Sequence, residues 1–264
     1  MYTISPIGSC RITSPLRSGQ NRHGIKLNLQ RCYGYCHSPA EAVQLARFMH
    51  GDHAIPKDIW PLICRSHDYD AITAQSHDPS DLYVIELASA KELTIDGVSV
   101  QLNYLRQAFP EFFEDEARLL QFWELAASEG QSATTDFLRE HWFADEKQAQ
   151  DTAVLSRLEL KFSDRESLRE NVSQLAELLP DVVFVSHVDA LKTDGKPIPS
   201  RSKFIKMVQD EVTDLGLKFY DPTELMQEFG QGSAIEDDST SLAHFTDEFG
   251  DAVMDQWMGQ FVEP

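Results

Sequence analysis

The chain has 264 residues, 43 acidic and 23 basic, and its formal net charge at pH 7 is −20. This charge argues against a nucleic-acid partner and against docking on anionic lipid, because both depend on basic surface. The longest apolar run, residues 182–185, is far shorter than the roughly 18 residues of a membrane helix, and the N-terminus has no signal-peptide pattern. We therefore expect a cytoplasmic protein without membrane insertion.

Four short apolar runs rich in β-branched residues have the pattern of buried parallel strands. They lie at residues 3–7, 82–87, 181–186 and 217–220. Amphipathic helices are predicted between them, at 39–49, 168–179 and 200–215. Alternation of strands and helices predicts an α/β protein with a doubly wound, mainly parallel sheet in a three-layer sandwich.

Two stretches exceed what a minimal sheet requires. We expect one domain over residues 1–264, with a small insertion at about 17–75 and a helical insertion at about 104–160. The second is acidic, rich in aromatic residues and free of strand-like runs between 104 and 150, so we expect its aromatic side chains to form a core. The polar stretch 230–241 is predicted to be a loop.

The four cysteines are Cys10, Cys32, Cys36 and Cys64. Free thiols are expected in a cytoplasmic chain of this size. A zinc site at Cys32, Cys36, His37 and Cys64 is an alternative, but the spacing matches no standard zinc motif. We therefore predict no metal site.

Residues 1–10 bring one cysteine to a position where α/β proteins place nucleophiles. Cys10 follows Gly8 and Ser9 at a predicted strand-to-helix turn, where helix N–H groups lower a thiol pKa and can hold an oxyanion. His244, near the C-terminus, is the candidate base. Loops after parallel strands converge on one edge, so we expect the Cys10 sulfur and a His244 ring nitrogen to lie roughly 3–5 Å apart. The alternative is a buried structural thiol and a surface histidine.

Together these residues resemble the SGNH (GDSL-type) hydrolase superfamily, in the branch whose first block reads Gly-Ser-Cys. GSCFA-domain proteins and WcbI-like polysaccharide acetyltransferases share this cysteine. The likeness covers residues 7–10 and extends to 84–89, 183–187 and 242–246. It implies a catalytic Cys10 with His244, and an oxyanion hole formed at Cys10, Ser89 and His187.

Three positions depart from the superfamily pattern. Ser241 stands where an Asp precedes the catalytic histidine by three residues, so Asp238 or Asp237 completes a triad or the site is a Cys–His dyad. Ala88-Ser89 replaces a Gly, and Ser89 is expected to donate through its backbone N–H. His187 replaces an Asn and is expected to donate through its side chain.

Three further residues are candidates for binding substrate. Arg11 follows the nucleophile and could bind a carboxylate or phosphate. Arg201 follows the third predicted strand, on the side of the sheet where ligands bind, and His37 is expected to line the cleft. The alternatives are ion pairs for the arginines and a structural role for the histidine.

The predicted activity is acyl transfer through a Cys10 thioester, with an O-acyltransferase or acetyltransferase acting on a glycan or small hydroxylated acceptor as the leading hypothesis. A thioester is close in energy to an acyl-CoA, which is therefore a candidate donor substrate, and no tightly bound cofactor is expected. An SGNH-type esterase and a catalytically silent α/β binding domain remain alternatives. The sequence does not determine the oligomeric state.

Overall fold

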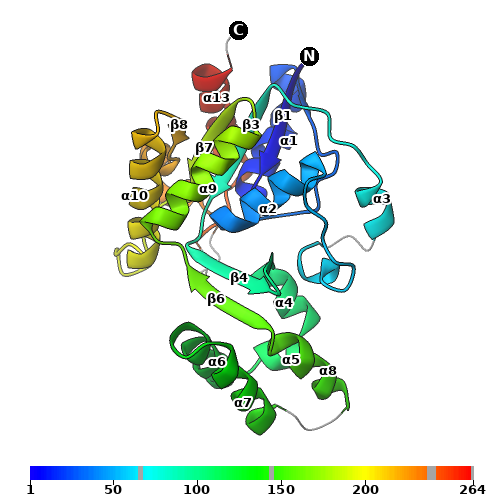
Figure 1. Cartoon of the computed structure of the whole chain (residues 1–264). Coiled ribbons are helices and arrows are strands. Elements are labelled where there is room, and N and C mark those ends of the chain that lie inside the picture. The colour runs from blue at the N-terminus through cyan, green and yellow to red at the C-terminus, as the bar shows by residue number, and fades with distance from the viewer. Residues whose placement is uncertain (65–67, 143–145, 237–241, 263–264) are drawn as a thin grey trace.

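A five-stranded sheet forms the centre of the computed structural model, which describes residues 1–64, 68–142, 146–236 and 242–262 (Figure 1). All its strands are parallel, in the order β2-β1-β3-β7-β8. The predicted α/β class with a mainly parallel sheet is confirmed. The strands are β1 (Tyr2–Ile7), β2 (Ile25–Leu27), β3 (Leu82–Leu87), β7 (Val182–Ser186) and β8 (Lys218–Tyr220).

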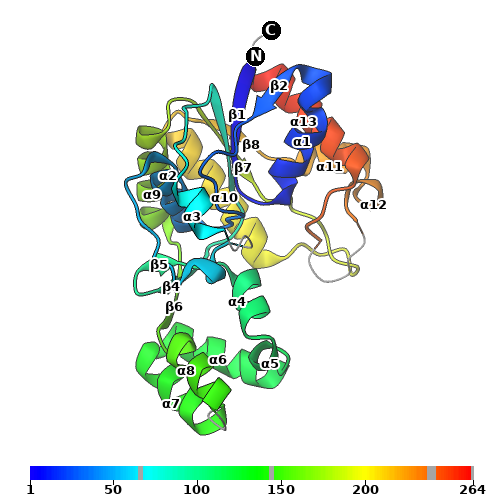
Figure 2. The same cartoon turned by 90° about the vertical axis from the view of Figure 1, so that its right-hand side faces the viewer.

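Helices cover both faces of the sheet and enclose two hydrophobic cores (Figures 1 and 2). One core includes Leu16, Phe249 and Trp257, whereas the other includes Phe48 and Leu175. The first face carries α1 (Cys10–His23), α11 (Thr223–Phe229), α12 (Gln231–Ala234) and α13 (Asp247–Phe261). The second carries α2 (Pro39–His50), α9 (Arg165–Leu178) and α10 (Pro199–Asp214), and the short η1 (Trp60–Leu62) and α3 (Tyr69–Thr73) follow α2 along the chain.

The stretch at 17–75 differs from the insertion that we expected. It contains strand β2, which pairs with β1 at the edge of the sheet, and helix α2, which packs beside α9 over the sheet. Because β2 has three residues and alternates in burial, no long apolar run marks it. This part of the chain therefore belongs to the sheet and its helical cover.

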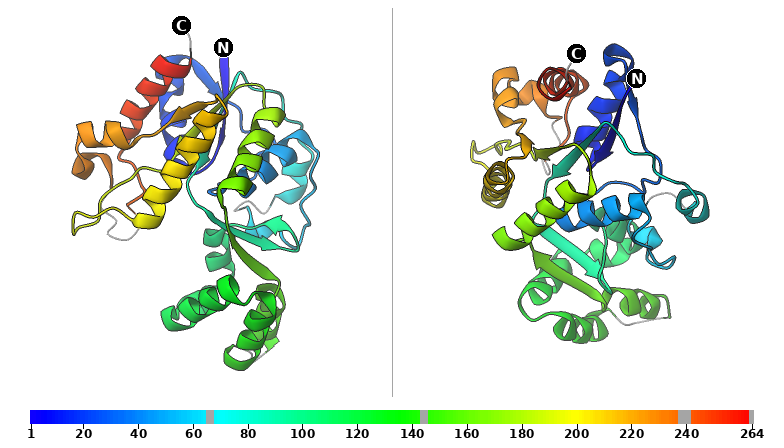
Figure 3. Two further views of the ribbon diagram at one scale, coloured as in Figure 1. Left: turned by 60° about the vertical axis from the view of Figure 1, so that its left-hand side comes forward. Right: turned by 45° about the horizontal axis from the view of Figure 1, so that its top comes forward.

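A second, antiparallel sheet connects the main sheet to the helices of the second insertion (Figures 1 and 3). Its strands were not predicted, because they alternate polar and apolar residues rather than forming continuous apolar runs. The strands are β4 (Lys91–Ile95), β5 (Val98–Ser99) and β6 (Leu158–Phe162). The helices are α4 (Leu102–Ala108), α5 (Pro110–Phe113), α6 (Glu116–Ser128), α7 (Gln131–His141) and α8 (Glu146–Leu155). Among the described residues, no helix is long and apolar enough to cross a membrane.

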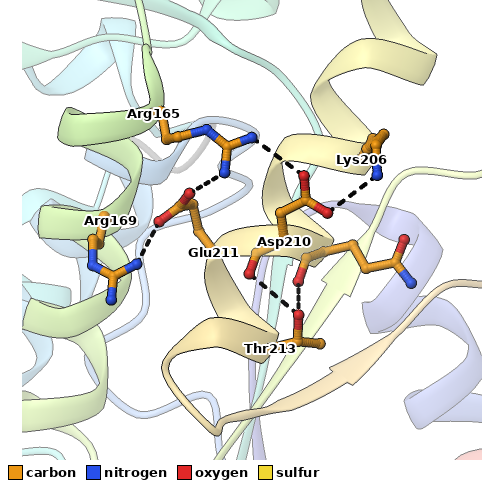
Figure 4. A network of polar contacts seen from close by, with 7 residues as sticks. Arg165, Arg169, Lys206, Asp210, Glu211 and Thr213 are labelled. Carbon is orange, nitrogen blue, oxygen red and sulfur yellow. Dashed lines mark hydrogen bonds and ion pairs between the residues drawn. The ribbon is translucent and has the colours of Figure 1, made fainter.

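A network of charged side chains joins α9 to α10 (Figure 4). The nearly buried carboxylate of Glu211 accepts hydrogen bonds from Arg165 and, at 2.8 Å, from Arg169. Asp210 accepts from Arg165 and from Lys206, each at 3.2 Å. These contacts hold α10 against α9. The first turn of α10 lines a pocket at the carboxyl end of the sheet.

Candidate active site

The turn between β1 and α1 places Cys10 at the first residue of a 14-residue helix. Ser9 caps this helix, with its hydroxyl oxygen accepting from the backbone N–H of Arg11 at 3.2 Å. Gly8 is packed so closely that a Cβ there would lie 2.6 Å from the Glu86 Cβ and 2.8 Å from the Ile12 Cδ1. Each residue of the Gly-Ser-Cys sequence therefore has a structural reason. Gly8 allows the turn to pack closely against β3, Ser9 caps the helix, and Cys10 places its thiol at the helix N-terminus.

The strand order puts this turn at a topological switch point. The chain moves from β1 outward to β2 and then returns to β3 on the other side of β1. Ligands of open α/β sheets bind outside the carboxyl ends of the strands at such a point. Cys10 follows β1 and Ser89 follows β3, so both lie at this edge.

Two adjoining pockets open here. The first, about 250 Å³, is lined by Cys10 and His244 together. The second, about 700 Å³, adjoins it because Arg11 and His244 line both. The remaining predicted residues gather in the second pocket: His37, Ser89, His187 and Arg201. A hydrogen bond between Cys10 and His244 stays a prediction, and Asp237 and Asp238 lie outside the described residues.

Arg11 forms a buried ion pair with Glu86, a strand residue that we did not predict for the site. Glu86 also accepts from the Ser9 N–H at 2.8 Å, so one carboxylate holds the turn at two points. A glutamate inside the apolar run of β3 is the sequence signal that could have identified it. The pair fixes the start of α1 against β3.

The two arginines of the site also hold the segment that carries His244. An Nη1 of Arg11 donates to the Ala243 carbonyl at 3.5 Å, and the Arg201 Nη1 donates to the Leu242 carbonyl at 3.1 Å. The His244 carbonyl accepts from the Glu236 N–H at 2.9 Å. Both arginines therefore hold the backbone that leads to His244, and their substrate-binding role stays a prediction.

The Cys10 pKa differs in direction from our expectation. Partial burial raises the pKa of the Cys10 thiol, the nearby Arg11 guanidinium lowers it, and Glu86 raises it further. Burial has the largest effect, so the net shift is upward. A thiol with a raised pKa is protonated at neutral pH and needs a base to become a nucleophile.

The donors that we expected at Ser89 and His187 in the oxyanion hole are engaged in other hydrogen bonds. The Ser89 N–H donates to the His37 carbonyl at 2.9 Å, so the expected backbone donor is occupied. The Ser89 hydroxyl oxygen accepts from the Lys91 N–H at 3.0 Å, which leaves its own proton to donate. The His187 Nδ1 lies 2.8 Å from the Val188 carbonyl, to which it must donate.

Two of the other thiols differ from Cys10 in their burial. Cys36 and Cys64 are buried, and burial raises the Cys36 pKa well above its ordinary value. Within the described ranges, no three His, Cys, Asp or Glu side chains gather in a group that could hold a metal ion. Cys10 therefore differs from Cys36 and Cys64 in lying at a pocket.

Comparison with known proteins identifies a family that matches nearly the whole chain. A family model described as the TviD N-terminal domain matches residues 2–260. The chain is 34% identical over 256 residues to the Vi polysaccharide biosynthesis protein TviD of Salmonella typhi, covering 96% of this chain and 31% of TviD. The chain thus spans about a third of the length of that relative.

A solved structure from Agrobacterium tumefaciens str. C58, assigned as an arylesterase, is also similar. The alignment has a TM-score of 0.39 and 13% sequence identity, and it covers 98% of this chain and 97% of that one.

Proposed function

Because the chain belongs to the family of the TviD N-terminal domain, we propose that it is an acyltransferase that modifies a hydroxylated glycan acceptor through a Cys10 thioester. One observation carries the proposal: a cysteine at a helix N-terminus and a histidine from the opposite end of the chain line one pocket at the switch point of the sheet. The relative's role in Vi polysaccharide biosynthesis supports a glycan acceptor. The resemblance to the Cys-nucleophile branch of the SGNH superfamily supports the chemistry.

The first half-reaction acylates the enzyme. His244 takes the proton of the Cys10 thiol, and the thiolate attacks the carbonyl carbon of the acyl donor. The oxyanion of the tetrahedral intermediate is held by the backbone N–H of Cys10, the first residue of α1. Collapse breaks the bond to the leaving group, which takes the proton from His244, and leaves a thioester on Cys10. An acyl-CoA is a suitable donor because the thioester exchange is nearly neutral in energy.

The second half-reaction transfers the acyl group. His244 takes the proton of an acceptor hydroxyl, whose oxygen attacks the thioester carbonyl. The carbon–sulfur bond then breaks, and Cys10 recovers its proton from His244. If an ester is the donor and water replaces the acceptor, the same steps hydrolyse that ester. An acylated sugar therefore indicates a transferase, whereas a free acid alone indicates an esterase.

Intact-mass measurement after incubation with a panel of acyl-CoA donors tests the proposal. The wild-type chain is expected to gain one acyl group, and the adduct is expected to map to Cys10. Cys32→Ala, a thiol outside both pockets, should acylate like the wild type, while Cys10→Ala should not. A wild-type chain that gains no adduct on Cys10 with any donor, and hydrolyses none of them, would contradict the proposal and favour a silent binding domain.

A further inference from the structure

The tautomer of His187 is fixed by a backbone carbonyl. A carbonyl oxygen can only accept, so the Nδ1 that lies 2.8 Å from the Val188 oxygen must carry a proton. Burial lowers the pKa of His187 well below its ordinary value, and the Arg11 and Arg201 guanidinium groups lower it further. The ring is therefore neutral, and its Nε2 has a lone pair and no proton. It is a hydrogen-bond acceptor.

The tautomer of His37 is fixed in the opposite sense, through Gln101. The Gln101 Oε1 accepts from the Asn103 N–H at 2.5 Å, which identifies the other amide atom as the nitrogen. That nitrogen lies 2.7 Å from the His37 Nδ1 and donates to it. Burial lowers the pKa of His37, so its ring is neutral with the single proton on Nε2. It is a hydrogen-bond donor.

Both rings line the second pocket. No hydrogen bond joins either Nε2 to another group in the part of the chain that the structure describes. The pocket thus presents one neutral acceptor and one neutral donor, each locked by a contact on its far side. A fixed tautomer makes recognition selective, because a histidine that can change tautomer binds a hydrogen-bond donor and an acceptor of the ligand equally well.

We propose that His187 and His37 bind the acceptor sugar as a complementary pair: the His187 Nε2 accepts from a hydroxyl, and the His37 Nε2–H donates to a neighbouring oxygen. The proposal rests on the proposed function and assigns the second pocket to the acceptor. Two adjacent sugar hydroxyls present a donor and an acceptor together, which is the complement of this pair.

A metal ion is the other partner that a histidine with one ring N–H on a carbonyl could have. The surroundings disfavour it, because the described lining of this pocket includes Arg11, Lys91 and Arg201 but no Asp, Glu or Cys side chain. No third metal-ligating side chain joins the two histidines among the described residues. A neutral hydroxyl is the better partner.

Ring nitrogen NMR tests the tautomers without turnover. With ¹⁵N-labelled histidine, long-range spectra are expected to show His187 protonated on Nδ1 and His37 protonated on Nε2 at neutral pH. A panel of monosaccharides that differ in their vicinal hydroxyls should shift the two Nε2 resonances. Either ring in the opposite tautomer, or no shift with any sugar, would overturn the proposal.

Asparagine substitutions test the binding role, because Asn places an amide near the Nδ1 position and has nothing at Nε2. His187→Asn can still donate to the Val188 carbonyl, and His37→Asn can still accept from Gln101. Each should raise the KM for the acceptor about tenfold, the size expected for one lost hydrogen bond. His187→Gln, which returns an amide near Nε2, should recover part of the loss.

The rate of Cys10 acylation separates this proposal from the proposed function. His187→Asn and His37→Asn should slow acceptor-dependent transfer by more than they slow Cys10 acylation, because the pair acts on the acceptor half-reaction, and an equal loss in both rates would overturn the pair. An unchanged acceptor KM in both variants would overturn the pair while leaving the proposed function intact. Absence of Cys10 acylation in the wild type would overturn the proposed function, and the sugar-induced shifts would still decide whether the pair binds sugar.

Discussion

The two halves of the candidate site are built in different ways. The half with the nucleophile is set by neighbours in sequence: Gly8 permits close packing, Ser9 caps the helix, and Cys10 is the helix's first residue. The half with His244 depends on distant residues, since Arg11 and Arg201 bind the carbonyls of the two residues before it. Arg11 belongs to both halves, because it also pairs with Glu86.

This difference determines how a substitution in one half of the site affects the other half. Changes in the Gly-Ser-Cys turn act on the thiol directly, whereas changes in the arginines act on the histidine through its backbone. Buried and local contacts should give large effects, and half-exposed tethers should give small ones.

Loss of the nucleophile should have the largest effect. Cys10→Ala should reduce acyl transfer about 10,000-fold, or about 5.4 kcal/mol in barrier, because no other described cysteine lines either pocket. Steady-state transfer assays measure it, and circular dichroism should show an unchanged fold. Substantial activity in this variant would remove Cys10 from the mechanism.

Breaking the Arg11–Glu86 ion pair, which both halves share, should have the second largest effect. Glu86→Ala leaves Arg11 buried without its partner and should destabilise the fold by about 3–5 kcal/mol in chemical denaturation. Asp70→Ala removes an exposed ion pair with Lys57 and should cost less than about 1 kcal/mol. Equal costs for the two variants would show that the Arg11–Glu86 pair has no special role.

Crowding the turn should have an intermediate effect. Gly8→Ala introduces a Cβ against Glu86 and Ile12 and should cost about 1–3 kcal/mol, as overpacking does. Gly259→Ala, in helix α13 with open space around the new Cβ, should be neutral or slightly stabilising. If Gly8→Ala is as stable and as active as the wild type, the packing argument for the turn is wrong.

Removing one tether of the histidine half should have the smallest effect. Arg201→Met keeps much of the side-chain volume and loses the contact with the Leu242 carbonyl, so it should cost about 1 kcal/mol of stability and lower kcat several-fold. Lys203→Met removes a positive charge from an exposed position on the same helix and should change neither the stability nor kcat. Matching kcat values for the two variants would argue against tethering.

The sequence predicted the sheet and the gathering of the site more fully than the chemistry of its residues. Cys10, His244, His37, Ser89, His187 and Arg201 do line adjoining pockets, because the ends of parallel strands meet at one edge. Their hydrogen-bonding roles could not be predicted, since these depend on contacts such as Gln101 to His37 that join distant segments. The upward pKa shift of Cys10 was missed for the same reason: burial is a property of the fold.

The pH dependence of Cys10 alkylation tests most directly whether the two halves act as one unit. Because burial raises the Cys10 pKa, the thiolate fraction at pH 7 is below that of an ordinary thiol, and reactivity without a base should rise only at alkaline pH. The account predicts that iodoacetamide modifies Cys10 at pH 7 at least tenfold faster in the wild type than in His244→Ala. The variant should regain reactivity above the ordinary thiol pKa. Equal rates in the two proteins at pH 7 would contradict the account.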